Sequence, residues 1–298
     1  MVKSSLNLKS FAKINLFLDV IGKLPDGYHE INTIFQTIDL YDEIFIQKLT
    51  QKTIRLTCNN NKIPIDNDSL LYQIAKRMTL KSETGIAIHL KKNIPIAAGL
   101  GGGSSNAATL MLGINEIFDL NWGIEYLTRT GLQYGMDIPF FFYRGTAFAS
   151  GRGEKIVPLF SIQPPLNLLL VNPGLEISTQ WAYQAVDQNP CHSLRKELKD
   201  TINPYRMNSF SLNHHEVKRI VFNRFEAVVS KRYPKITQIK ETLLKNGAIV
   251  ASLTGSGPTV FAVMNDAFKA EKIYHTLKDQ FPFVILAQTI DAKDIKIY

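Results

Sequence analysis

Hydrophobic residues alternate with polar ones in several short segments of the first half of the chain. A spacing of two places alternate side chains on opposite faces of an extended strand, so this pattern predicts β-strands. A turn built on Pro25, Asp26 and Gly27 separates the first two of them. The predicted strands of this half cover residues 16–20, 43–47, 54–57, 86–90 and 147–150.

In other segments the hydrophobic residues recur at the spacing of an α-helix. Ala107, Met111, Ile114 and Phe118 recur on one face of a helix that follows a run of glycines. In the second half, two helical patterns cover residues 214–231 and 235–245. Strands are predicted at 248–253 and 259–263, joined by a tight turn at 255–258. Without an internal repeat or low-complexity stretch, the chain is predicted to have an α+β fold.

The length of 298 residues and the hydrophobic fraction of 45% suit a globular protein of two packed domains. A change in amino-acid composition marks the expected boundary between the two domains. Gly151 and Gly153 are followed by Pro158, Pro164 and Pro165. We therefore expect an N-terminal domain of residues 1–160 and a C-terminal domain of residues 161–298.

Composition also bears on location and partners. Cys58 and Cys191 form no paired motif, no apolar secretory segment follows Met1, and no apolar run approaches the roughly 20 residues of a membrane helix. These features predict a cytoplasmic protein without a membrane partner. The net charge of +8 comes from scattered basic residues, so we expect a solvated surface and an anionic small-molecule ligand rather than a nucleic acid. The sequence carries no signal for oligomeric state.

The segment 95–108, Pro-Ile-Ala-Ala-Gly-Leu-Gly-Gly-Gly-Ser-Ser-Asn-Ala-Ala, joins a predicted strand to a predicted helix. Four glycines between Gly99 and Gly103 remove side chains and let backbone N–H groups turn toward one point. Ser104 or Ser105 is expected to cap the helix and to reach a phosphate oxygen or Mg²⁺. The segment is therefore predicted to bind phosphate at the helix N-terminus, the alternative being a merely flexible loop.

Two common nucleotide-binding motifs do not fit this segment. A Walker A loop requires a G-x-x-x-x-G-K-[ST] pattern, and the dinucleotide fingerprint requires glycine where the chain has Ser104. The six histidines show no metal-ligand spacing, so no transition-metal site is predicted and Mg²⁺ is expected to arrive with the nucleotide phosphates.

Asp137 and Lys13 are the candidate catalytic residues. Phosphoryl transfer to an alcohol needs a base that removes the hydroxyl proton late in the reaction, and a carboxylate suffices. Asp137 lies between Gly135 and Pro139 and is expected to project from a loop or from the start of an element, where its alternative role is a turn or cap. Lys13 lies in an apolar strand and is either an outer-face residue or the cation that holds the carboxylate ionised. Asn15, on the same strand face, is a candidate donor to the substrate.

The glycine segment resembles the phosphate loop of the superfamily of galactokinase, homoserine kinase, mevalonate kinase and phosphomevalonate kinase (GHMP kinases). Within it, the chain resembles the 4-diphosphocytidyl-2-C-methyl-D-erythritol kinase family along nearly its whole length. The resemblance rests on Ser-Phe-Ala-Lys-Ile-Asn at 10–15, Asp-Gly-Tyr-His at 26–29, Gly-Met-Asp-Ile-Pro at 135–139, the segment 145–154, Ser-Thr-Gln-Trp-Ala-Tyr at 178–183 and Leu-Thr-Gly-Ser-Gly-Pro at 253–258.

The resemblance implies a GHMP-kinase fold with an N-terminal α+β domain like ribosomal protein S5, a ferredoxin-like C-terminal domain and the active site in the cleft between them. It implies an ATP- and Mg²⁺-dependent kinase of the non-mevalonate isoprenoid pathway that phosphorylates the 2-hydroxyl of 4-(cytidine 5'-diphospho)-2-C-methyl-D-erythritol. The third motif, at 253–258, would support the glycine loop, although its residues could also form a plain turn. The residues implied to bind ATP are Pro95, Ile96, Ala97, Ala98, Gly99, Leu100, Gly101, Gly102, Gly103, Ser104 and Ser105.

In this family the Asp-Gly-Tyr-His element recognises cytosine, which implies that Tyr28 and His29 bind the base and that Tyr183 covers its other face. Trp181 is the alternative to Tyr183, and Lys92 is interpreted as a solvated charge at the end of a strand. A departure from the family pattern in the segment 66–70 leaves the adenine contact open. Two alternative functions also stay open: another GHMP kinase of the homoserine or phosphomevalonate type, and a nucleotide- or nucleic-acid-binding protein without catalysis.

Overall fold

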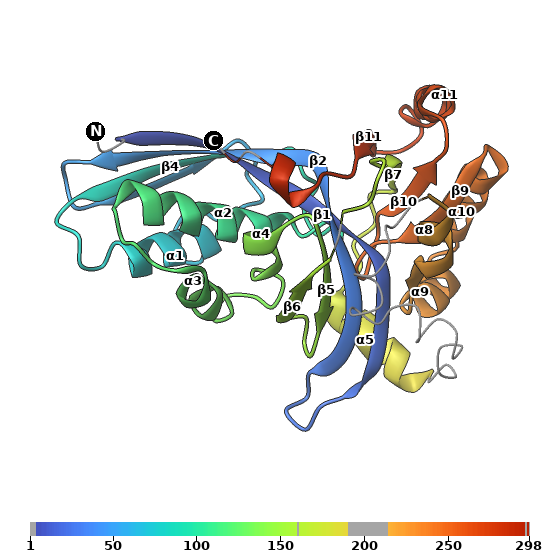
Figure 1. Ribbon diagram of the computed structural model, residues 1–298, viewed down its shortest axis with the longest axis horizontal. Helices are drawn as coiled ribbons and strands as arrows, with labels where there is room; N and C mark the ends of the chain where they lie inside the picture. Colours follow the sequence, from blue (N-terminus) through green and yellow to red (C-terminus); the bar gives the residue numbers. More distant parts are fainter. Residues whose placement is uncertain (1–3, 160, 190–213, 296, 298) are drawn as a thin grey trace.

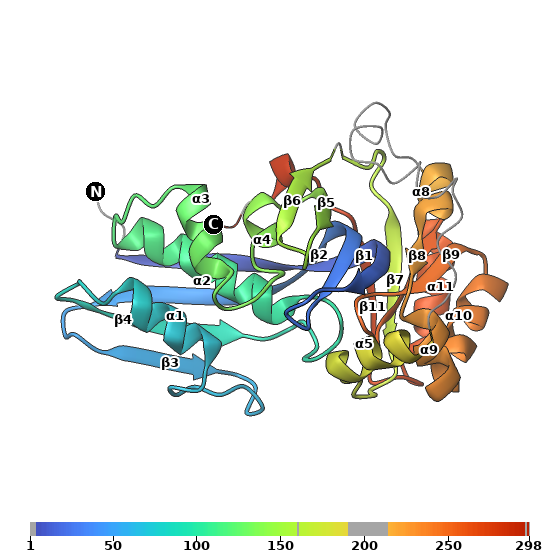
Figure 2. The same ribbon diagram turned by 90° about the horizontal axis from the view of Figure 1, so that it is seen from below.

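Two β-sheets organise the protein, as the computed structural model shows (Figures 1 and 2). The structure describes residues 4–159, 161–189, 214–295 and 297, so Cys191 lies outside the described residues. The larger sheet has the order β3-β4-β2-β1-β8, with β5 paired to β2 and β6 to β5. The smaller sheet has the order β11-β7-β10-β9. Their strands are β1 (Ser5–Lys23), β2 (His29–Leu49), β3 (Ile54–Cys58), β4 (Gly85–Lys91), β5 (Thr146–Ser150), β6 (Lys155–Pro158) and β8 (Phe222–Asn223), and then β7 (Asn167–Asn172), β9 (Ala248–Leu253), β10 (Val260–Met264) and β11 (Phe283–Gln288).

Strands β1 and β2 form one long antiparallel hairpin that projects beyond the rest of the larger sheet (Figure 1). The segments 16–20 and 43–47 do form strands, but each is only part of a strand of 19 or 21 residues. The alternating pattern stops in the middle of β1, because residues from Ala12 to Leu18 are buried on both faces. Irregular register at three points of the hairpin further disturbs the spacing of two. The predicted turn at Pro25 to Gly27 connects the two strands.

In the part of the chain that the structure describes, four helices accompany the larger sheet, and α2 packs directly on β1 and β2. Ala107, Met111 and Ile114 of α2 are completely buried in a core shared with Ile44 and Ile46 of β2. The helical spacing read from the sequence is therefore confirmed, with the apolar face against the sheet. The helices are α1 (Leu70–Met78), α2 (Gly102–Ile117), α3 (Ile124–Gly131) and α4 (Phe140–Tyr143).

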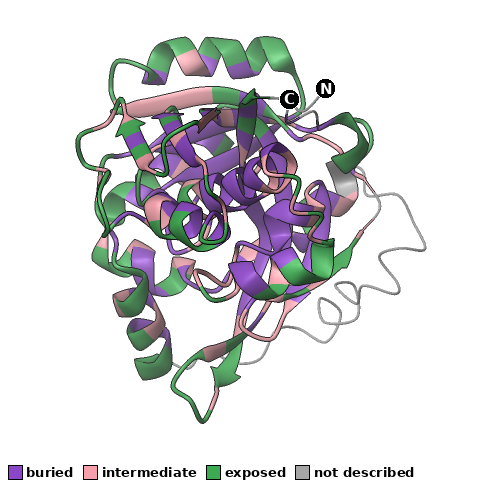
Figure 3. Cartoon of the chain, turned by 90° about the vertical axis from the view of Figure 1, so that its left-hand side faces the viewer, coloured by how far each residue is buried: buried purple, intermediate pink, exposed green. Residues whose placement is uncertain are grey.

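The smaller sheet lies between its own helices and the larger sheet. On β7, Leu168 and Leu170 face a core shared with β1 and β2, whereas Leu169 and Val171 face the helices. Because strand β7 is buried on both faces, its sequence reads as continuously apolar. Figure 3 shows the buried residues gathered in the interior, between the layers. The helices on this side are α5 (Thr179–Gln188), α8 (His214–Ile220), α9 (Glu226–Arg232), α10 (Pro234–Lys245) and α11 (Ala267–Leu277).

The α+β class is confirmed, whereas the single helix expected over 214–231 is wrong. Helix α8 ends at Ile220, strand β8 pairs with Phe17 and Leu18 of β1, and a separate helix, α9, begins at Glu226. Asn223 holds this break, because its side-chain amide donates to the carbonyl oxygens of Leu253 and Gly255. Tertiary hydrogen bonds thus override the local helical spacing. Helix α10 agrees with the pattern at 235–245.

The domain boundary expected between residues 160 and 161 stays a prediction. The second sheet begins at β7, but β8 from the second half of the chain adds to the first sheet. Within the part of the chain that the structure describes, no helix has the length and apolar character needed to cross a membrane.

Candidate active site

Two cavities meet at the glycine loop. The first, here called the acceptor cavity, has a volume of about 610 Å³ and lies between the β1–β2 hairpin, the glycine loop and α5. The second, the loop cavity, has a volume of about 510 Å³ and is lined by the glycine loop itself. Gly99 and Gly101 line both. A ligand bound along the loop therefore reaches the wall of the acceptor cavity.

All but one of the residues predicted to bind ATP line the loop cavity, the exception being Ser105. The backbone turns sharply here, since Ala97, Gly99 and Gly101 have φ angles of 52°, 76° and 69°. A Cβ atom on Gly99 would lie 2.1 Å from the carbonyl oxygen of Thr254. Close packing against other parts of the protein, and not only ligand access, therefore requires glycine at this position.

The serines after the glycines do not cap α2. Gly101 occupies the N-cap position without a side-chain hydrogen bond, and the helix begins at Gly102. Ser105 lies one turn further in, where its hydroxyl donates to the carbonyl oxygen of Phe11 at 2.6 Å. The expectation of a serine cap is thus wrong, because the left-handed Gly101 starts the helix early. Ser104 lines the loop cavity, whereas Ser105 is buried against β1.

Lys13 and Asp137 lie close together in the lining of the acceptor cavity. Lys13 Nζ lies 3.9 Å from the Asp137 carboxylate, and their side chains are 4% and 36% exposed. Burial lowers the pKa of Lys13, and the charge of Asp137 opposes that decrease. Lys13 is therefore a buried cation rather than a solvated outer-face residue. Asp137 lies in the turn before α4, as the loop prediction required.

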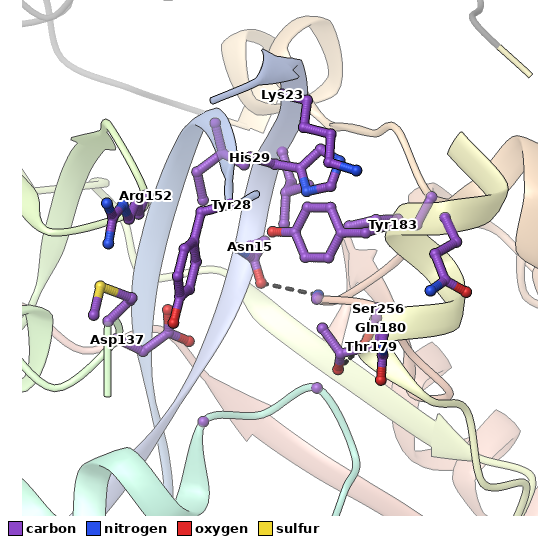
Figure 4. A pocket seen from close by; sticks show the side chains of 18 of the residues that line it. Asn15, Lys23, Tyr28, His29, Asp137, Arg152, Thr179, Gln180, Tyr183 and Ser256 are labelled. Atoms are coloured by element: carbon purple, nitrogen blue, oxygen red, sulfur yellow. Dashed lines mark hydrogen bonds between the residues drawn. The ribbon is translucent and has the colours of Figure 1, made fainter. Parts of the chain in front are cut away.

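Asn15 ties this pair to the third motif. Its side-chain oxygen accepts hydrogen bonds from Lys13 Nζ at 2.7 Å and from the backbone N–H of Gly255 at 2.9 Å. Asn15 is labelled in Figure 4. Its amide nitrogen donates to Thr33. Although Asn15 lines the acceptor cavity, it is 1% exposed and orients the site from within the protein. The segment 253–258 thus does more than form a turn, since it packs on both Asn15 and the glycine loop.

Aromatic side chains form the far end of the acceptor cavity. In Figure 4, Tyr28 projects from the β1–β2 connection and Tyr183 from α5, on opposite sides of the cavity. The ring of His29 stacks on Tyr183 with centroids 4.5 Å apart and an interplanar angle of 19°. Burial, together with the charge of Asp137, raises the pKa of Tyr183 to about 12. Trp181 instead packs edge-on against Tyr233, so Tyr183 is the aromatic residue of α5 in the cavity.

Lys92 is not the solvated charge expected from its position at the strand end. Its side chain is 5% exposed and forms an ion pair with Asp42, which is fully buried. Asp42 also accepts hydrogen bonds from the backbone N–H groups of Asn93 and Ile94 and from the side chain of Asn106. This network fixes the start of the glycine loop to α2, and Lys92 lines the loop cavity.

Arg152 and Asp187 also line the acceptor cavity and were not singled out from the sequence as site residues. Arg152 stacks over the ring of Tyr28 at 4.4 Å and forms an ion pair with Asp26. Asp187 bonds to His29. Asp187 could have been found from its position four residues after Tyr183, which places both on one face of α5.

Comparisons with known proteins agree with this geometry. Residues 69–145 match the family model of the GHMP kinases N terminal domain, and residues 208–282 match that of the GHMP kinases C terminal domain. The protein named 4-diphosphocytidyl-2-C-methyl-D-erythritol kinase from Caldanaerobacter subterraneus is 41% identical over 96% of this chain and 97% of its own. Its namesake from Caldicellulosiruptor bescii is 38% identical over 96% and 99%.

The chain belongs to the 4-diphosphocytidyl-2-C-methyl-D-erythritol kinase family. The resemblance noted in the sequence is thereby confirmed, together with its GHMP-kinase fold. A crystal structure of 4-(cytidine 5'-diphospho)-2C-methyl-D-erythritol kinase has a TM-score of 0.78 at 24% identity and covers 95% of this chain and 99% of its own. Homoserine kinase from Cytophaga hutchinsonii has a TM-score of 0.74 at 17% identity, with 98% and 96% covered. Since the fold is shared by kinases of different substrates, membership of the 4-diphosphocytidyl-2-C-methyl-D-erythritol kinase family rests on sequence.

Proposed function

We propose that this protein transfers the γ-phosphoryl group of ATP to the 2-hydroxyl of 4-(cytidine 5'-diphospho)-2-C-methyl-D-erythritol, in the non-mevalonate isoprenoid pathway. One observation carries the proposal. The Lys13–Asp137 pair lies in a cavity that opens onto the glycine loop at Gly99 and Gly101. A phosphate held by the loop can thus meet an acceptor hydroxyl held by the pair.

In this proposal the triphosphate of ATP binds in the loop cavity. The N-terminus of α2 offers unpaired backbone N–H groups and the positive end of the helix dipole, both of which attract phosphate. The ammonium group of Lys92 also lies beside this helix start, where Asp42 holds it in place. The adenosine is assigned to the outer part of the same cavity, where Ile63, Pro64 and Ile96 supply apolar walls.

Asp137 is assigned as the general base and Lys13 as its partner. As the acceptor oxygen bonds to the γ-phosphorus, the Asp137 carboxylate takes the hydroxyl proton and ADP leaves with the electrons of the broken bond. The ammonium of Lys13 orients the carboxylate and offsets the negative charge that develops on the transferring group. Asn15 holds Lys13 in place through its side-chain oxygen.

Magnesium is proposed to come with ATP. Among the described residues no group of three or more histidine, cysteine or acidic side chains could hold a metal ion. Mg²⁺ commonly keeps waters and substrate phosphates as ligands and takes only one or two from the protein. Ser104, in the loop cavity, is the proposed protein ligand. Bound there, Mg²⁺ would neutralise charge on the phosphates.

The cytidine end of the substrate is assigned to Tyr28, His29 and Tyr183. Rings that face each other across the cavity can stack on a base, and a buried polar group can read its edge. We also propose a cytoplasmic location, because Cys58 and Cys191 form no paired motif in the sequence. A cavity of this size, lined by cations and aromatic residues, supports a small anionic metabolite rather than a nucleic acid as the partner.

Direct measurement of ADP release with a panel of acceptors tests the proposal. We expect turnover with the cytidine diphosphate derivative of methylerythritol and none with homoserine, galactose or phosphomevalonate. Turnover that prefers one of the latter would assign the chain to another GHMP kinase activity. Absence of ATP turnover with every acceptor would contradict the proposed kinase function.

A further inference from the structure

Helix α5 holds the imidazole ring of His29 in two ways. Asp187 Oδ1 lies 2.8 Å from His29 Nε2, and the ring of Tyr183 stacks on the imidazole face. Tyr183 and Asp187 are four residues apart and hence neighbours on one face of the helix. His29 itself begins strand β2 and comes from the other half of the chain. The side chain of His29 is 9% exposed, so its orientation is fixed by these contacts.

The hydrogen bond to Asp187 also decides which ring nitrogen carries the proton. An ionised carboxylate can only accept, so Nε2 must be the donor. In the neutral imidazole the lone pair is then on Nδ1. Among the described residues, Nδ1 of His29 has no hydrogen-bond partner. The acceptor cavity is therefore lined by a residue with one unused acceptor of fixed position.

The other oxygen of Asp187 does not disturb this arrangement. Lys23 Nζ lies 3.8 Å from Oδ2, and the side chain of Lys23 is 59% exposed. A long, solvent-exposed ion pair of this kind has little energy. The shorter contact with His29 is the better defined of the two.

We propose that Asp187 is a positioning residue that selects cytosine over uracil by holding His29 in the Nε2–H tautomer. Nδ1 then accepts a hydrogen bond from the 4-amino group of cytosine. Uracil carries a carbonyl oxygen at that position, and two acceptors would face each other without a proton between them. A site built for one hydrogen bond rejects an analogue that leaves its polar groups unpaired. This inference rests on the proposed function.

Asp187→Asn is the decisive variant. Its side chain has the same shape, but its NH₂ group can donate to Nε2 and so allow the opposite tautomer. If Asp187 only filled space or fastened α5 to the hairpin, this variant would behave like the wild type. Asp187→Glu keeps an acceptor-only group and serves as the conservative replacement. Glu241→Gln, an exposed acid-to-amide change on α10 outside the acceptor cavity, is the matched control.

The first experiment compares kcat/KM for the cytidine and uridine diphosphate derivatives of methylerythritol. For Asp187→Asn we expect about a tenfold or greater loss with the cytidine compound, mainly through KM, and a smaller change with the uridine compound. The preference for cytosine should therefore shrink, whereas Asp187→Glu should recover part of it and Glu241→Gln should leave it intact. An unchanged preference in Asp187→Asn would overturn the inference.

The second experiment needs no substrate. Long-range ¹H–¹⁵N spectra of protein labelled at histidine nitrogens, with His29 assigned through His29→Gln, report which nitrogen is protonated. We expect protonated Nε2 and bare Nδ1 in the wild type, and a loss of this pattern in Asp187→Asn. A proton on Nδ1 in the wild type would refute the tautomer even if the kinase reaction is found. Conversely, the expected spectrum without any turnover of the cytidine compound would contradict the proposed function and the base selection built on it.

Discussion

Gly99 of the glycine loop lies directly against the carbonyl group of Thr254 in the third motif. A Cβ atom added to Gly99 would be 2.1 Å from that oxygen, far below any normal contact distance. The Thr254 hydroxyl also lies 3.2 Å from the Gly99 carbonyl oxygen, to which it donates. Gly99 and Thr254, 155 residues apart in the sequence, thus pack directly against each other.

This contact makes substitutions in the glycine run unequal. We expect Gly99→Ala to lower the free energy of unfolding by about 1–3 kcal/mol, through the clash and the positive φ of 76°. Gly103 provides the control, because no atom lies within 4 Å of its added Cβ and it already lies in α2. Gly103→Ala should be neutral or stabilise the protein by up to about 1 kcal/mol. Equal stabilities of the two variants in urea unfolding would contradict this account.

The assignment of Asp137 as the base predicts a specific pattern of kinetic loss. Asp137→Asn keeps the shape of the side chain but removes its basicity. We expect kcat to fall by about 10²–10⁴-fold, the usual contribution of general base catalysis, with little change in ATP affinity. Single-turnover measurement of ADP release, with ATP affinity measured by calorimetry, checks both parts. Near-normal turnover of Asp137→Asn would remove Asp137 as the base.

Local patterns in the sequence predicted some parts of this site and not others. The strand, loop and helix around Gly99 follow from spacing and glycine content. Tyr28, His29 and Tyr183 were named through the family resemblance, and they line the same cavity as Lys13, Asn15 and Asp137. The environment of Lys92 could not be read, because its partner Asp42 lies 50 residues earlier and the pair is buried only when β2 and the loop meet.

The helix break at Asn223 and the inward hydroxyl of Ser105 escaped prediction for the same reason. Asn223 bonds to Leu253 and Gly255, some 30 residues away, and Ser105 bonds to Phe11 across 94 residues. Helical spacing and capping preferences depend only on nearby residues in the sequence. A buried hydrogen bond to a distant residue can outweigh them, and such a bond cannot be read from the local pattern.

The buried pair of Asp42 and Lys92 predicts an asymmetric response to mutation. Asp42→Asn leaves the ammonium of Lys92 with a neutral partner in a buried position and is expected to cost about 3–5 kcal/mol of stability. Replacing both residues by apolar ones, as in Asp42→Leu with Lys92→Met, should cost less than Asp42→Asn alone if the apolar side chains fit. Urea unfolding of the two variants gives the comparison. A double variant that loses as much stability as Asp42→Asn, or more, would show that charge burial is not the cause.

The pKa shift of Lys13 predicts where activity declines at alkaline pH. Burial lowers this pKa below its usual 10.5, and catalysis needs the ammonium form. The rate should therefore fall as the pH rises through the lowered pKa, so that the alkaline limb of kcat/KM lies below pH 10.5. Tyr183, whose pKa is raised to about 12, keeps its proton throughout this range. Tyr183→Phe should consequently leave the pH of this alkaline decline unchanged, whatever its effect on KM for the cytidine compound. Chromatographic measurement of ADP avoids coupling enzymes that fail at high pH. A limb that moves in Tyr183→Phe, or that lies above pH 10.5, would assign the titration to a group other than Lys13.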